Sequence, residues 1–211
     1  MNYLSSKSRI ILFVFILIPV FCLAKIDPLK GYSQIVTKKS KPNVNLVSKD
    51  TAFTKLSSVE ATESNLTMED SVVAYSDDQL LLSNYKLFKF KSKNSNPKQY
   101  SIKIYSMCDC WGFKKFIFVP QISVMDKAGK TIEKKEVESK FLYPEVDSRM
   151  SLQKTWVTES TTEQNISIVV YSDNSQLNTD VFKFVMLPVF LPINIKTSLV
   201  GDFYIKIEEL K

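Results

Sequence analysis

Histidine is absent from this chain of 211 residues, and glycine is rare, with four in total. The lack of histidine excludes Ser-His-Asp and Cys-His catalysis, HExxH zinc sites and histidine proton shuttles. The isolated glycines exclude phosphate-binding loops, which cluster two or three of them. We therefore expect a binding or structural protein without a cofactor or metal, and not an enzyme; a hydrolase using cysteine or carboxylates is the weaker alternative.

The residues that are present are those of a globular protein. Hydrophobic side chains make up 45% of the sequence and charged ones 24%, and the length suits one domain with a real core. Lysines alternate with aromatics, as in Phe88-Lys89-Phe90-Lys91, which is typical of a solvated sheet face. Because the basic residues are spread out in this way, nucleic acid is not an expected partner.

The first 24 residues have the order of a secretory signal peptide. Lys7 and Arg9 precede an unbroken apolar run from Ile10 to Ala24. This run is shorter than the roughly 20 apolar residues of a membrane-spanning helix. We therefore expect cleavage after Ala24 and no stable membrane span afterwards. The weaker alternatives are an uncleaved anchor and lipidation of Cys22.

The mature chain divides into two parts by composition. Residues 25–71 are rich in Ser, Thr, Lys and Asn, and we interpret them as a flexible polar linker or arm, with a short helix over 51–56. Residues 72–211 carry the domain. Within the domain, apolar and polar side chains alternate with a period of two, as at 203–207, and this pattern is typical of half-buried strands.

Strands outnumber every other element that the pattern predicts. The apolar stretch 116–124 is interrupted at Pro120, which is tolerated at strand edges and bulges. A hairpin turn is expected over 126–130. Only 131–140 and 172–185 could be helical. The predicted fold class is all-β: an antiparallel β-sandwich, jelly-roll-like, with a short helix or two.

Several stretches of the domain resemble the maltose operon periplasmic protein family in spacing and apolar pattern. They are residues 51–56, 120–126, 141–144, 165–177 and 200–207. The resemblance implies a periplasmic protein associated with carbohydrate uptake, and it supplies no catalytic or ligand residues.

Two cysteines, Cys108 and Cys110, remain after signal removal. An even pair in an oxidising compartment favours a disulfide between them, although the ring is very small. Two reduced thiols, or a Cu(I) site that includes Met107, are the alternatives.

Trp111 and Trp156 are the candidate platforms for stacking a sugar ring, and core packing is the competing interpretation for both. The predicted function is that of a periplasmic, non-enzymatic accessory protein of carbohydrate uptake or envelope glycan handling. Its expected partner is an oligosaccharide or envelope glycan. The alternative is a structural or interaction subunit of a cell-envelope complex, whose polar arm docks onto an envelope protein. An exposed aromatic strip favours the first function, and a large apolar patch favours the second.

Overall fold

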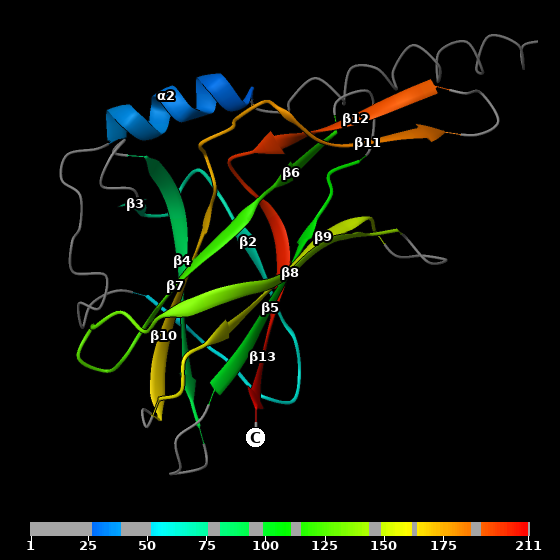
Figure 1. The fold of residues 1–211 in the computed structure, drawn as a ribbon. Coiled ribbons are helices and arrows are strands. Elements are labelled where there is room, and N and C mark those ends of the chain that lie inside the picture. The colour runs from blue at the N-terminus through cyan, green and yellow to red at the C-terminus, as the bar shows by residue number, and fades with distance from the viewer. Residues whose placement is uncertain are drawn as a thin grey trace, which may run out of the picture.

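The structure is a computed structural model that describes residues 27–38, 52–75, 81–92, 99–110, 115–143, 149–161, 164–186 and 191–210 (Figure 1). The expected signal peptide and Trp111 lie outside these residues. The described elements are α2 (Pro28–Lys38), β1 (Thr54–Lys55), β2 (Thr62–Leu66), β3 (Val72–Ala74), β4 (Leu82–Lys91), β5 (Gln99–Met107), β6 (Phe116–Phe118), β7 (Pro120–Met125), β8 (Lys134–Leu142), β9 (Ser151–Thr158), β10 (Asn165–Ser172), β11 (Asp180–Met186), β12 (Leu191–Ser198) and β13 (Gly201–Leu210).

The described strands form a sandwich with jelly-roll topology, as the sequence predicted. One sheet has the order β2-β13-β5-β9-β8, and the other has the order β1-β4-β10-β7, with β3 beside β4. A jelly roll pairs its eight strands as 1-8-3-6 in one sheet and 2-7-4-5 in the other. Here β2-β13-β5-β9 reproduces the first order and β4-β10-β7 most of the second. The departure is β8, which takes the fifth place in sequence and pairs with β9 instead of β7.

The core lies between the two sheets and explains why they stack. Phe88 and Ile168 from one sheet, and Ile104 and Phe203 from the other, are fully buried in a single cluster. The rings of Phe88 and Phe203 meet across the interface, with centroids 5.9 Å apart in an edge-to-face arrangement. Burial of such alternating side chains is the main force that holds the two layers together.

A small third sheet, β11-β12-β6, extends the sandwich at one end (Figure 1). Strand β6 belongs to this sheet, whereas β7 belongs to the sandwich, and they are separated by Val119. Pro120 is the first residue of β7. The predicted interruption at Pro120 is therefore confirmed, because a residue without an N–H group is tolerated at the start of a strand. Gly129, with φ of 86°, completes the predicted turn over 126–130.

None of the three segments that the sequence left open to a helix is helical where the structure describes it. In the segment 51–56, Thr54 and Lys55 form strand β1, parallel to β4, and the Leu56 N–H donates to the Lys89 carbonyl over 2.9 Å. In the segment 131–140, most residues belong to β8. This charged strand pairs with β9 at the sheet edge, where Lys and Glu side chains stay solvated.

The segment 172–185 begins with the last residue of β10, then turns, and then forms β11. Asn178 takes a left-handed conformation with φ of 59°, which a helix does not accommodate. The Thr179 N–H donates to the Thr197 hydroxyl over 3.2 Å, so a contact distant in sequence fixes the turn. Tertiary hydrogen bonds thus override the local helical propensity.

Part of the segment 25–71 that we interpreted as an arm is built into the domain. Strand β2 pairs with β13, and helix α2 buries Ile35 completely. Asp27 caps this helix by accepting a hydrogen bond from the Leu29 N–H over 2.9 Å, and Pro28 follows at the first helical position. The sequence contained this start signal, but the polar composition around it concealed the helix. Within the described residues, no helix is both long enough and apolar enough to cross a membrane.

Candidate functional site

The sheet β2-β13-β5-β9-β8, whose five strands follow one another in a single order and which we call the five-stranded sheet, carries two neighbouring tyrosines on its outer face. On β13, Phe203 and Ile205 point into the core, so Tyr204 between them points outward. Tyr105 of β5 lies directly opposite Tyr204, and Gln153 of β9 lies opposite Tyr105. Both tyrosines are half-buried. Directly opposed residues on one face of a sheet have Cβ atoms about 5 Å apart, so the two tyrosines are neighbours on this face.

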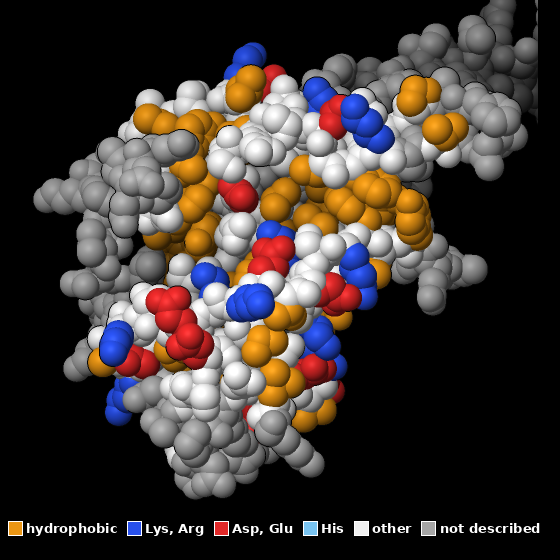
Figure 2. Space-filling model, viewed as in Figure 1, with side chains coloured by type: hydrophobic (Ala, Val, Ile, Leu, Met, Phe, Trp, Pro, Cys, Tyr) orange, Lys and Arg blue, Asp and Glu red, His pale blue; other side chains and the backbone are white. Residues whose placement is uncertain are grey.

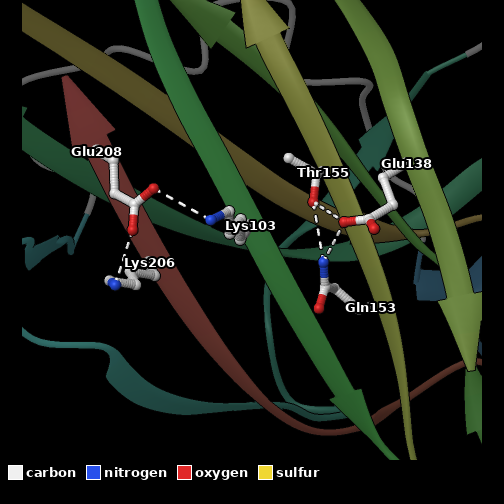
Figure 3. A network of polar contacts seen from close by, with 6 residues as sticks. All are labelled: Lys103, Glu138, Gln153, Thr155, Lys206 and Glu208. Atoms are coloured by element: carbon white, nitrogen blue, oxygen red, sulfur yellow. Dashed lines mark hydrogen bonds and ion pairs between the residues drawn. The ribbon is translucent and has the colours of Figure 1, made fainter. Parts of the chain in front are cut away.

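A charge network lies beside the tyrosines on β5 and β13 (Figure 3). The Glu208 carboxylate accepts a hydrogen bond from Lys206 at 2.7 Å and another from Lys103 at 3.1 Å. The lysines lower the pKa of Glu208, Lys206 more than Lys103, and Glu208 raises the pKa of Lys206. Glu208 and Lys206 are therefore both charged at neutral pH, and the contacts with Lys103 and Lys206 hold the Glu208 carboxylate in place.

A second polar cluster lies on β8 and β9, on the other side of Lys103 from Glu208 (Figure 3). The Glu138 carboxylate accepts hydrogen bonds from the Gln153 amide and, at 3.3 Å, from the Thr155 hydroxyl. Its other oxygen contacts Lys140 at 2.6 Å, and this hydrogen bond lowers the pKa of Glu138. Gln153 and Thr155 are only 7% and 5% exposed although they lie on an outer face. Their positions are fixed by neighbouring side chains.

Together these groups form a surface of fixed polar side chains next to two tyrosines. Such a surface offers aromatic rings for stacking and carboxylate and ammonium groups for hydrogen bonding to hydroxyls. Because the polar groups already hold one another, little side-chain entropy is lost when a ligand binds.

Trp156 is not available as a stacking platform, so that candidate is wrong. It lies opposite Ile102 on the inward face of β9 and is 2% exposed, within the core cluster. Lys154 lies on the same side of the strand, with its ammonium 5.5 Å from the indole centroid. The two tyrosines were missed, although their alternation with Ile104 and Ile205 was the signal that could have identified them.

Cys108 and Cys110 are joined by a disulfide directly after β5, with Cα atoms 5.2 Å apart. Cys108 is 1% exposed and packs against Ile117, Met150 and Leu152 in a cluster beneath the third sheet. The pair is thus part of a packed end of the molecule. Among the described residues, no group of three or more His, Cys, Asp or Glu side chains is placed to hold a metal ion.

An apolar surface lies between the third sheet and the ends of β8 and β9 (Figure 2). Phe141 and Phe182 stack with ring centroids 4.3 Å apart, and Tyr143 meets Phe182 edge-on at 5.8 Å. Tyr143 is 62% exposed. Exposed aromatic clusters of this kind are candidates for protein contacts.

Comparison with family models, with curated proteins and with solved structures finds no match to this chain. The resemblance to the maltose operon periplasmic family accordingly stays a prediction from the sequence.

Proposed function

We propose that this protein is a non-enzymatic accessory protein of the periplasm that binds an oligosaccharide or envelope glycan on the outer face of the five-stranded sheet. The observation that carries the proposal is the pair Tyr105 and Tyr204, which lies next to the Glu208 and Glu138 clusters on the same face. Sugar rings have apolar faces and polar edges. The tyrosines match the faces, and the fixed polar side chains match the hydroxyls.

We expect the affinity to be weak. The surface is open, and two stacking rings contribute about 0.5–1.5 kcal/mol each beyond their buried area. Against the free energy of immobilising a ligand, this leaves dissociation constants on the order of 0.1 to 1 mM.

The test is ligand-observed NMR or calorimetry with maltodextrins and peptidoglycan fragments. Tyr105→Ala/Tyr204→Ala should weaken binding about tenfold or more, because both ring faces are lost. Tyr105→Phe/Tyr204→Phe should retain most of the affinity, since the rings remain. Tyr143→Ala, which removes an exposed tyrosine elsewhere, is the matched control and should change nothing. The absence of binding of every glycan at about 10 mM, or cleavage of any glycan, contradicts the proposal.

The second candidate is interaction with an envelope protein, and the apolar surface around Phe182 is the observation in its favour. If one envelope protein is recovered stoichiometrically with the wild type but not with Phe182→Ser, while no glycan binds, this function replaces the first.

A further inference from the structure

A pocket of about 390 Å³ opens on the other sheet, across β1, β4, β10 and the turn after β7. Four of its lining residues are lysines: Lys55, Lys89, Lys91 and Lys127. Lys89 and Lys91 alternate with Phe88 and Phe90, which are buried in the core, so their side chains leave the outer face of the sheet. The volume falls within the range of about 300–1,000 Å³ that is typical of small-molecule sites.

Among the described residues that line the pocket, none carries a carboxylate. Asp126, the acidic neighbour of Lys127 in sequence, uses one oxygen to accept hydrogen bonds from the N–H groups of Ala128 and Lys130, each over 2.8 Å. An adjacent hollow that shares Lys91 contains one glutamate, Glu209. In the part of this site that the structure describes, positive charge therefore exceeds negative charge, in contrast to the balanced network on the five-stranded sheet.

The floor of the pocket is apolar. Phe53 is 43% exposed, and the Lys89 ammonium lies 4.0 Å from its ring centroid. Leu56 and Ile166 line the same space, and Ser167 adds a hydroxyl. A cation held over an aromatic ring remains free to attract an anion from the open side.

We infer that this pocket binds an amphiphilic anion, in which one phosphate or carboxylate is attached to an apolar chain or ring. The lysines attract the charged end, and Phe53 and Leu56 pack against the apolar end. This site lies on a different sheet from the tyrosine surface and does not depend on the glycan proposal.

The test uses octyl phosphate as the probe. Inorganic phosphate, which has only the charged group, and octanol, which has only the apolar chain, are tested separately. We expect octyl phosphate to perturb the NMR signals of the pocket and to bind at least tenfold more tightly than either half. Raising the NaCl concentration from about 0.05 to 0.5 M should weaken its binding severalfold, because partly exposed charges are screened. Vesicles containing phosphatidylglycerol test in parallel whether a lipid headgroup is also accepted.

The variant for this test is Lys55→Gln/Lys89→Gln, which should lower the affinity for octyl phosphate about tenfold. Phe53→Asn should lower it severalfold and leave the weak response to inorganic phosphate unchanged. The control is Lys135→Gln, an exposed lysine on β8 of the other sheet, which should have no effect. The proposal is overturned if octanol binds as well as octyl phosphate, if the double variant binds like the wild type, or if nothing binds at about 10 mM.

Discussion

The two outer faces of the sandwich carry different side chains, although both arise from the same alternating sequence pattern. On the five-stranded sheet, lysines and glutamates neutralise one another, as Lys103 and Lys206 do with Glu208. On the other sheet, the outward side chains of β4 change along the strand from apolar, at Tyr85 and Leu87, to the lysines that line the pocket. Alternation with a period of two therefore shows which residues share a face of the sheet. It does not show whether that face is exposed to solvent, because exposure depends on what packs above it.

The apolar part of this second face behaves as a small core of its own. Tyr85, Leu87, Val169 and Tyr171 are each at most 8% exposed. Tyr75 packs over them, with its ring centroid 4.8 Å from that of Tyr171, and burial raises the pKa of both phenols. The outer face of the five-stranded sheet, which we call the polar platform, is thus lined by charged and polar side chains, whereas the apolar part of the other outer face is covered.

The largest expected effect tests whether the inward side of the five-stranded sheet differs from its outward side. Trp156→Ala should destabilise the protein by about 3–5 kcal/mol, because the ring is fully buried and leaves a cavity. The neighbouring outward substitution, Tyr105→Ala, should change stability by less than about 1 kcal/mol. Urea unfolding measures the stability of both variants, followed by far-UV circular dichroism because tryptophan fluorescence changes when Trp156 is removed. Equal losses would remove the distinction between the two sides.

The next effect tests the comparison between the outer faces themselves. Leu87→Ala should destabilise the protein by about 2–4 kcal/mol, as expected for a core leucine, although it lies on an outer face. The matched change on the polar platform is Tyr204→Ala, for which we expect less than about 1 kcal/mol. If Leu87→Ala is as mild as Tyr204→Ala, the cluster is not a second core.

A smaller effect is expected at the end of β5, the strand that carries Tyr105. The Cys108–Cys110 loop is so short that the chain-entropy model assigns its closure only about 1.6 kcal/mol. Cys108→Ala/Cys110→Ala should therefore lower Tm by no more than about 8 °C and leave glycan binding unchanged. Differential scanning calorimetry with and without a reductant checks this value. A larger loss would mean that the pair fixes the packing of the whole end of the molecule.

The smallest effect concerns the pH dependence of the platform. The pKa of Glu208 is lowered from its ordinary value of 4.5, so its stabilising contribution is present above that pH and is lost as the pH falls below it. The pKa of Lys206 is raised above 10.5, so its contribution is lost only at higher pH. Glu208→Gln should remove a few tenths to about 1 kcal/mol of the change in stability between pH 6 and 3. Glu60→Gln, in the exposed loop before β2, should leave that change intact when both are followed by thermal melts.

The sequence predicted the layers better than the local elements. Strict alternation at 203–207 and 166–170 determined the inward faces, and hence the sandwich, because burial decides strand orientation. The same alternation could not show that Trp156 points inward. Lys154 lies on the same side of β9, and a charged residue at an inward position makes that side look polar in the sequence. The pocket was not predictable either, because it joins lysines that lie far apart in the sequence.

Strand β13 determines when the domain can fold. It lies between β2 and β5, and its Phe203, Ile205 and Ile207 are fully buried. Every other described strand precedes it in the sequence, so a ribosome must synthesise about 200 residues before the five-stranded sheet can close. Roughly 100 residues separate the end of β5 from the end of β13, and at about 5–20 residues per second the β2 and β5 edges stay unpaired for about 5–20 s. The protein therefore depends on late, long-range closure, and it is exposed to chaperones or to aggregation throughout its synthesis.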